Sequence, residues 1–310
     1  MTRVGAVDIG TNSVRLLVAD LESGPAGRLS TVDRRMQITR LGEGVDAARL
    51  LAPAAIARTM TVLTEYGATM RELGVERVRA TATSAARDAA NRDELFTAAS
   101  DALGVTPELL SGLEEAHLSF CGSTAALRAE PTPYLVIDIG GGSTEFILGP
   151  PADSDTPQGL ISIDVGCVRM TEQFLQSDPP RPEELSDAVS VVRDHLADVE
   201  QALPHIREAR TAIGLAGTIT TVAAVEQGVP YSRDAVHHFR LTRVAAEDVF
   251  RTLALESLAE RRHNPGLEAG RVGTIVGGCV VLVAVMRSFG LPELLVSEDD
   301  ILDGLARSLA

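Results

Sequence analysis

The chain has 310 residues, of which 45% are hydrophobic and 23% charged, a globular composition that excludes a largely disordered protein. Its formal net charge of −15 and its lack of tryptophan argue against non-specific binding to nucleic acid or acidic membranes. The three cysteines, Cys121, Cys167 and Cys279, share no close spacing, so neither a zinc site nor a disulfide framework is indicated.

A strand is expected almost at the first residue, which leaves no room for a signal peptide. The longest uncharged apolar stretch, residues 272–286, is too short to span a membrane and predicts a buried helix. We therefore expect a cytoplasmic protein in a reducing compartment, with no membrane partner. Its length favours two domains.

The predicted elements alternate between strands and helices, which is typical of an α/β fold. Small residues and prolines at 129–133 place a domain boundary near residue 127, giving domains 1–127 and 128–310, with the terminal helix able to pack back on the first. Hairpins are predicted at residues 4–19 and 134–148, further strands at 29–38, 75–80, 107–110 and 211–215, and helices at 53–73, 87–103, from 111, 183–203, 272–286 and 300–310, with a loop at 81–87.

The two hairpins carry the same turn, repeated 130 residues later in the chain. Successive N–H groups in such a turn can form a nest for phosphate oxygens. The turn is not a P-loop, because no G-x-x-x-x-G-K-[ST] is present, and a strand rather than a dinucleotide-binding helix follows the glycines. The repeat therefore suggests two similar domains that share an anionic ligand. The alternative is that both are ordinary turns, each with a buried aspartate and no ligand. The matched positions are Asp8 with Asp138, Ile9 with Ile139, Gly10 with Gly140 and Ser13 with Ser143.

The hairpins differ two residues after the shared serine, where the first has Arg15 and the second has Glu145. A cation can hold phosphate directly, whereas a carboxylate needs a metal ion between them. Asp138 and Glu145 are therefore a predicted ligand pair for Mg²⁺ or another divalent cation, which takes one or two carboxylates beside phosphate and water.

Two further segments carry chemical content. Ser111 and Glu114 form a capping box that begins a helix, which leaves Glu115 able to act as a general base toward water or to remain a solvated acid. Residues 213–220 pass from a strand through glycine into a helix. The first N–H groups of that helix could bind phosphate or a nucleoside, or simply make a tight connection that needs no ligand.

These motifs together resemble the exopolyphosphatase/guanosine pentaphosphate phosphohydrolase (Ppx/GppA) family, and more narrowly its short, two-domain actinobacterial members. The resemblance is carried by DIGTNSVRLLV at 8–18, LGEGV at 41–45, ATATSAARDAAN at 80–91, SGLEEAHLSF at 111–120, VIDIGGGSTEFILG at 136–149, GLAGTITTVAA at 214–224 and VHHFRLT at 236–242. It implies two actin-like (ribonuclease H-like) domains of the ASKHA superfamily, with a cleft between them.

The implied activity is Mg²⁺-dependent hydrolytic release of terminal phosphate from inorganic polyphosphate. The resemblance makes Glu115 the general base and associates Asp138 and Glu145 with the metal. Residues implied in phosphate binding, or proposed from the patterns above, are Asp8, Thr11, Asn12, Ser13, Arg15, Arg87, Gly140, Gly141, Gly142, Ser143, Thr144, Gly217, Thr218 and Arg271.

The chain departs from the family pattern at two places. The family's R-A-D appears as Arg271-Val272-Gly273, and residues 297–304 lose a glycine and an arginine of S-x-x-G-L-R-E-G. We expect both departures to lie away from the chemistry and to affect substrate preference. Hydrolysis of guanosine pentaphosphate or nucleoside triphosphates remains an alternative, as does an ATP-binding module or kinase of the superfamily. Polyphosphate or a phosphorylated nucleotide is the expected partner, and a homodimer is possible.

Overall fold

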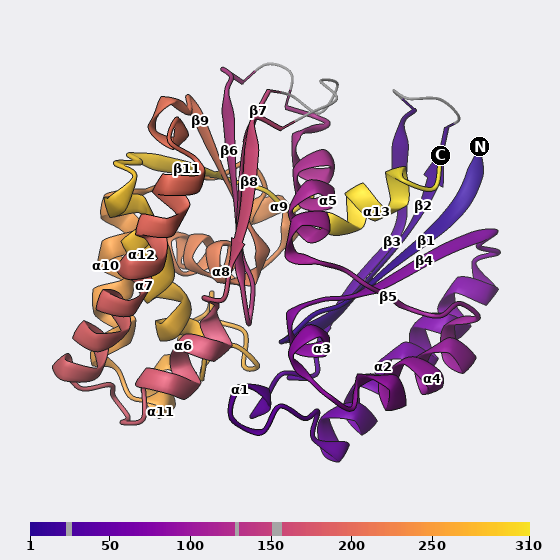
Figure 1. Cartoon of the computed structure of the whole chain (residues 1–310), viewed down its shortest axis with the longest axis horizontal. Helices are drawn as coiled ribbons and strands as arrows, with labels where there is room; N and C mark the ends of the chain where they lie inside the picture. The colour runs from indigo at the N-terminus through magenta and orange to yellow at the C-terminus, as the bar shows by residue number, and fades with distance from the viewer. Residues whose placement is uncertain (23–26, 128–129, 151–156) are drawn as a thin grey trace. The chain divides into compact units, whose positions relative to one another are not determined.

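The computed structural model describes residues 1–22, 27–127, 130–150 and 157–310 (Figure 1). The chain divides into two compact units, one made of Met1–Gly122 with Asp299–Ala310 and the other of Ser123–Glu298. The boundary expected near residue 127 stays a prediction, and residue 128 lies outside the described residues.

The first unit is built on a five-stranded mixed sheet in the order β3-β2-β1-β4-β5. The first three strands are antiparallel, whereas β4 and β5 run parallel to β1. Their bounds are β1 Thr2–Ile9, β2 Ser13–Leu21, β3 Leu29–Ile38, β4 Arg77–Ala82 and β5 Glu108–Leu109.

The second unit repeats this topology in the order β8-β7-β6-β9-β11-β10. Strands β6, β7 and β8 are antiparallel, β9 and β11 continue in parallel from β6, and β10 adds an antiparallel edge. This match confirms the predicted α/β class with two similar domains. The bounds are β6 Tyr134–Ile139, β7 Thr144–Gly149, β8 Gly159–Ile163, β9 Thr211–Leu215, β10 Arg240–Thr242 and β11 Glu293–Val296.

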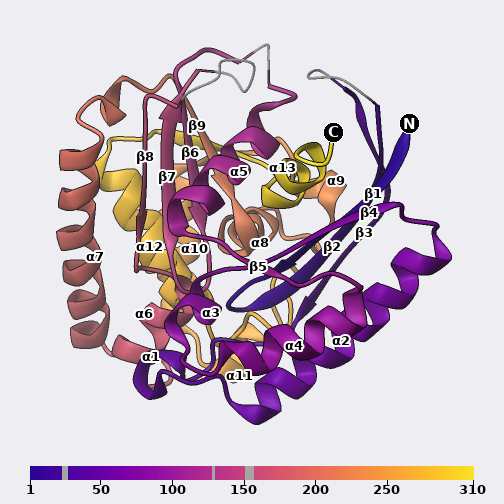
Figure 2. The same cartoon turned by 45° about the vertical axis from the view of Figure 1, so that its right-hand side comes forward.

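Helices cover both faces of the first sheet (Figure 2). Alternate residues of β1 point to opposite faces, so Val7 and Ile9 join a core with α2 and α4, whereas Val4 and Ala6 join a core with α13. The helix predicted at residues 53–73 is α2, which begins with a proline in its first turn; the chain then turns at Gly74, which has a positive φ. The helices are α1 Val45–Ala48, α2 Pro53–Glu72, α3 Ser84–Asp88, α4 Arg92–Leu103, α5 Gly112–Thr124 and α13 Ile301–Arg307.

The core of the second unit is centred on α12, the predicted apolar helix, which contacts α6, α7, α8 and α10. Within the described ranges, no helix is both long enough and apolar enough to cross a membrane. The helices are α6 Cys167–Phe174, α7 Pro182–Ala202, α8 Ala216–Gln227, α9 Arg233–Val236, α10 Arg243–Leu255, α11 Leu258–Arg261 and α12 Ile275–Ser288, with a short 3₁₀ turn at Ile206–Glu208.

The segment after α2 differs from the sequence prediction. The strand expected at residues 75–80 starts two residues later, and the loop expected at 81–87 contains the end of β4 and the short helix α3. Pairing with β1 sets this register, because Thr81 lies opposite Asp8 and Ala82 opposite Ile9. Local composition, rich in alanine and threonine, carries no signal for that pairing.

Candidate functional site

The turns of the two hairpins share one geometry. The N–H of Gly10 donates to the carbonyl of Ser13 at 3.0 Å, and the N–H of Gly140 donates to that of Ser143 at the same distance. A Cβ on Gly10 or Gly140 would lie 3.0 or 3.1 Å from that carbonyl oxygen, which is tighter than side chains normally tolerate. The turn therefore favours glycine at this position in both units.

The first hairpin neutralises its own buried carboxylate. Asp8 and Arg15 are directly opposite each other on β1 and β2. Arg15 Nη2 lies 2.7 Å and Nε 3.1 Å from Asp8 Oδ2. Asp8 is only 2% exposed, and this burial raises the pKa of its carboxyl group although the arginine opposes the shift. Both predicted site residues are thus brought together, as an ion pair.

This ion pair extends to the C-terminal helix. Arg15 also pairs with Asp300, the N-cap of α13, and Arg34 of β3 binds Asp300 and Asp303 at 2.9 Å each. Burial raises the pKa of Asp303. The expectation that the departure at residues 297–304 lies away from the candidate chemistry is therefore wrong for Asp300, which stands where the family pattern has glycine. It reaches Arg15 because α13 packs on the sheet face that carries this arginine.

The turn of the first hairpin holds polar atoms without partners. Thr11 is used internally, because its hydroxyl accepts from the N–H of Ala85 at 3.2 Å. In the described part of the chain, both side-chain amide atoms of Asn12 and Oδ1 of Asp8 are buried and have no hydrogen-bond partner. Ser13 supplies the carbonyl that closes the turn. Unpaired buried polar atoms are costly, so this cluster favours a polar ligand at the turn.

The predicted capping box begins α5. The backbone N–H and hydroxyl of Ser111 donate to Glu114 Oε2 at 2.9 and 2.8 Å, and the N–H of Glu114 donates back at 3.2 Å. These bonds from Ser111 lower the pKa of Glu114. Glu115 is held differently, because Nη1 of Arg87 donates to its Oε2 at 2.8 Å and to the carbonyl of Leu110 at 2.9 Å. Arg87, proposed to contact phosphate, thus fixes the proposed general base.

The second hairpin places two carboxylates where the first has an ion pair. Asp138 lies directly opposite Glu145 on β6 and β7, and the two residues are 6% and 1% exposed. Like charges at directly opposite positions destabilise a sheet. Ser162 of β8 donates its hydroxyl to Glu145 Oε1 at 2.7 Å, which orients one oxygen without supplying charge.

This donor set fits a hard divalent cation such as Mg²⁺. Two oxygen ligands on adjacent strands are the protein contribution that magnesium usually takes, with water and phosphate completing its coordination. No group of three or more Asp, Glu, His or Cys that could hold a metal occurs within the described ranges. The remaining ligands would therefore come from substrate or solvent.

The loop after β6 has its carbonyl groups occupied by the start of α6. The N–H of Cys167 donates to the carbonyl of Gly140 at 3.0 Å, and Nε of Arg169 donates to that of Gly142 at 2.9 Å. The carbonyl of Gly141 also accepts hydrogen bonds from α6. The N–H groups of Gly141 and Gly142 donate to no backbone carbonyl in the described residues. These two N–H groups can therefore donate to an anion. The hydroxyl of Thr144, by contrast, donates internally to a carbonyl, that of residue 165.

Three further predicted residues meet at the start of α8. A Cβ on Gly217 would lie 1.8 Å from Nη1 of Arg271, so the guanidinium packs directly on this glycine. Arg271 also pairs with Glu268 at 2.8 Å. Thr218 follows in the first turn, and Ala216 before it adopts a positive φ of 67°, a strained conformation that is common at ligand sites.

Several residues of these clusters were not predicted as site residues from the sequence, among them Asp300, Arg34, Ser162 and Arg169. The sequence did point to Asp300, because it is an acid at a position where the family pattern has glycine. It gave no indication of Arg34, Ser162 or Arg169, because their contacts form only when strands pair or when a loop packs against a helix.

Comparisons with known proteins show which family the chain belongs to. The model of the Ppx/GppA phosphatase family matches residues 17–309. The chain is 43% identical to exopolyphosphatase 2 of Mycobacterium tuberculosis, over 100% of this chain and 99% of that protein. Among solved structures, an exopolyphosphatase-like protein shares 34% identity with a TM-score of 0.94, covering 100% of this chain and 98% of the other. The Ppx/GppA protein of Aquifex aeolicus shares 32% identity with a TM-score of 0.81, covering 99% and 97%. The chain therefore belongs to the Ppx/GppA phosphatase family.

Proposed function

We propose that this protein is an exopolyphosphatase, which hydrolyses the terminal phosphoanhydride bond of inorganic polyphosphate. The observation that carries the proposal is the pair of buried carboxylates, Asp138 and Glu145, at the place where the first hairpin has Asp8 and Arg15. Two carboxylates at directly opposite positions supply the oxygen ligands that a divalent cation takes beside phosphate. Polyphosphate as substrate is supported by the name of the 43% identical mycobacterial relative.

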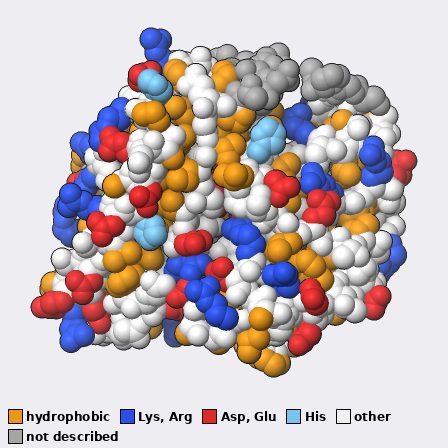
Figure 3. All heavy atoms as spheres, viewed as in Figure 1, with side chains coloured by type: hydrophobic (Ala, Val, Ile, Leu, Met, Phe, Trp, Pro, Cys, Tyr) orange, Lys and Arg blue, Asp and Glu red, His pale blue; other side chains and the backbone are white. Residues whose placement is uncertain are grey.

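The charge of the chain favours metal assistance with such a substrate. The net charge is −15, and the sequence contains no lysine. On the face that Figure 3 shows, acidic and basic side chains are interspersed rather than gathered into one basic surface. A polyanion must therefore be held by arginine, backbone N–H groups, histidine or a metal ion. Asp138 and Glu145 would hold a divalent ion, which would neutralise charge on the phosphates.

Different groups of the chain have different roles in the proposed hydrolysis. The N–H groups of the loop at Gly141 and Gly142 bind oxygens of the terminal phosphate, and Glu115 accepts a proton from water. The water oxygen bonds to the terminal phosphorus as the bond to the bridging oxygen breaks, which leaves orthophosphate and a chain shorter by one unit. Arg87 keeps the carboxylate of Glu115 in place.

Phosphate release tests the proposal, measured with and without Mg²⁺ on long and short polyphosphate, guanosine pentaphosphate and ATP. Removing a general base typically costs about 10²–10⁴-fold in rate, so we expect Glu115→Gln to lose roughly 100-fold or more. Glu114→Gln is the matched control, because it makes the same change one residue earlier and keeps an acceptor for Ser111. Near wild-type turnover in Glu115→Gln would refute the assignment.

The substrate series separates the alternatives. Preferential release from guanosine pentaphosphate or ATP, on the same residues, would make the protein a nucleotide phosphohydrolase. Absence of release from all four substrates would favour an ATP-binding module or a kinase. A homodimer and a cytoplasmic location stay predictions.

A further inference from the structure

A cavity of about 560 Å³ lies in the first unit, beside the helix that carries Glu115. Its walls include Leu113, His117 and Cys121 of α5, Arg79 of β4, and Arg307 and Ser308 at the end of α13. We propose that this cavity binds an organic anion with an apolar body, and that its occupant changes the rate of the reaction proposed above. The second half of this inference rests on the proposed function, whereas the first does not.

The size and lining of the cavity are those of a small-molecule site. Pockets for small ligands typically measure about 300–1,000 Å³ and combine apolar walls with a few polar groups. Leu113 lines the edge of the cavity and is 55% exposed, so its side chain supplies apolar surface that a ligand can cover.

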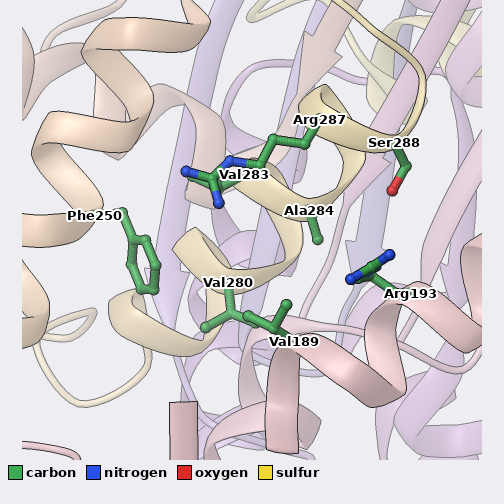
Figure 4. Close-up of a pocket in the computed structure, with 8 residues that line it drawn as sticks. All are labelled: Val189, Arg193, Phe250, Val280, Val283, Ala284, Arg287 and Ser288. Carbon is green, nitrogen blue, oxygen red and sulfur yellow. The ribbon is translucent and has the colours of Figure 1, made fainter. Parts of the chain in front are cut away.

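The second unit has a smaller hollow of about 220 Å³ between α7, α10 and α12 (Figure 4). Its lining is mainly apolar, with Phe250 on one side and Arg193 on the other. This hollow is below the usual size for a ligand pocket, and none of its lining residues is a candidate site residue. It therefore supplies a control position rather than a second proposal.

The charges around the larger cavity favour an anion. Arg79 is neutralised by Glu108, with Nη2 2.8 Å from Oε2, and also donates to Ser308 at 2.7 Å. Glu114, another wall residue, is held by its capping bonds. Arg307 donates to the carbonyl of residue 27 at 3.1 Å, yet no carboxylate lies within 4.0 Å of it in the described residues. Its Nε is buried without a partner among the described residues. The guanidinium of Arg307 is therefore a wall cation with no carboxylate of the described chain at ion-pair distance.

The same two helices that bound the cavity also bear parts of the candidate site. Helix α5 holds Glu115 one residue after the wall residue Glu114, and the N-cap of α13, Asp300, pairs with Arg15.

The helices touch backbone to backbone, because a Cβ on Gly122 would lie 1.8 Å from the carbonyl oxygen of Asp300, and one on Gly304 2.1 Å from that of Leu118. A ligand in contact with both helices would favour one packing of this pair over others. It can shift that equilibrium only by its difference in affinity for the two packings.

The chain provides its own reporter for occupancy. Cys121 is partly exposed in the cavity wall, with Sγ 3.6 Å from Nε2 of His117. The other two cysteines, Cys167 and Cys279, are 6% and 0% exposed. Burial raises the pKa of the Cys121 thiol, so its alkylation should be slow enough to time by hand. Its protection by a ligand would locate binding without any mutation.

The test uses 8-anilinonaphthalene-1-sulfonate, an aromatic sulfonate that fluoresces when bound in apolar surroundings. We expect the fluorescence to saturate with probe concentration. At saturation, alkylation of Cys121 by N-ethylmaleimide, monitored by peptide mass spectrometry, should be at least fivefold slower. Arg307→Met should weaken binding about tenfold or more and remove the protection, whereas Arg193→Met, at the smaller hollow, should change neither. Leu113→Ser, at an exposed position that folding does not need, should also weaken binding. Saturation without protection, or unchanged affinity in both Arg307→Met and Leu113→Ser, would overturn the assignment.

Phosphate release at saturating probe tests regulation separately. We expect at least a twofold change in turnover in the wild type and none in Arg307→Met. Unchanged turnover in a protein whose Cys121 is protected would refute the regulatory role. Since fluorescence and alkylation need no turnover, a protein that binds the probe but hydrolyses nothing would contradict the proposed function and leave the binding site in place.

Discussion

Replacing Arg15 by methionine tests whether the ion pair of the first hairpin stabilises its unit. The substitution keeps the apolar stem and removes the charge that faces Asp8 and Asp300. Asp8 is 2% exposed, and its second oxygen already lacks a partner in the described residues. Removing one member of a buried pair typically costs about 3–5 kcal/mol, because it leaves an uncompensated buried charge. We expect a loss of this size at pH 7.

The loss should depend on pH in a defined direction. Burial raises the pKa of Asp8 in the folded state, and the attraction of Arg15 partly offsets this rise. Without the arginine the folded-state pKa rises further. For a carboxyl group with a raised pKa, stability is fully present below the unfolded value of about 3.9 and is lost as pH rises through the folded value. The deficit of Arg15→Met should therefore be small near pH 4 and grow toward pH 7.

Hydrogen exchange of the amides in β1 and β2 is the appropriate assay, because it reports the opening free energy of this unit apart from the other. Asp8→Asn and the double variant complete a cycle in which Asp8→Asn should recover most of the loss. A deficit below about 1 kcal/mol at pH 7, or one that does not change between pH 4 and pH 7, would show that the buried pair is not the stabilising feature inferred from its geometry.

Three other substitutions test separate features. Asp300→Gly restores the glycine of the family pattern and removes one acid from Arg15, so the KM for polyphosphate should fall severalfold at low salt; an unchanged KM would exclude competition between Asp300 and phosphate. Gly304→Ala places a Cβ 2.1 Å from the carbonyl oxygen of Leu118 and should cost about 1–3 kcal/mol or more, seen as a lower Tm; an unchanged Tm would mean that the helices can separate freely. Asp138→Asn relieves the like-charge pair, so the metal-free protein should become more stable while phosphate release falls; lower stability would contradict the repulsion.

The sequence contained the parts of the site that are local in the chain. The turn at Gly10 and its copy at Gly140, the capping box at Ser111, and the exchange of Arg15 for Glu145 each follow from residues within one hairpin or one helical turn. The structure contains these turns, this capping box and this pair of opposite positions, because the backbone geometry of a single hairpin or helical turn is set by neighbouring residues. The metal and phosphate roles assigned to them stay predictions.

Contacts between distant segments could not be predicted in this way. Asp300 meets Arg15 across 285 positions of sequence, through packing of a helix on a sheet. Ser162 reaches Glu145 only because β8 adds to β7 in one register. The late start of β4 is likewise set by its partner β1. In each case packing between distant segments determines the contact, and neither the hydrophobic periodicity nor the propensity of the local sequence predicts it.

The two hairpins share one backbone turn but differ in the charge of the residue opposite the buried aspartate. In the first, the residue facing the buried aspartate is an arginine, and a helix from the end of the chain supplies a further acid, so the charges are balanced within the unit. In the second, the equivalent residue is Glu145, which lies directly opposite Asp138 and accepts a hydrogen bond from the neutral Ser162. Two directly opposed carboxylates destabilise a sheet, so stability alone does not account for this pair. The pair is the arrangement expected if the second unit holds a cation and Glu115 of the first unit acts as the base, the two roles proposed above.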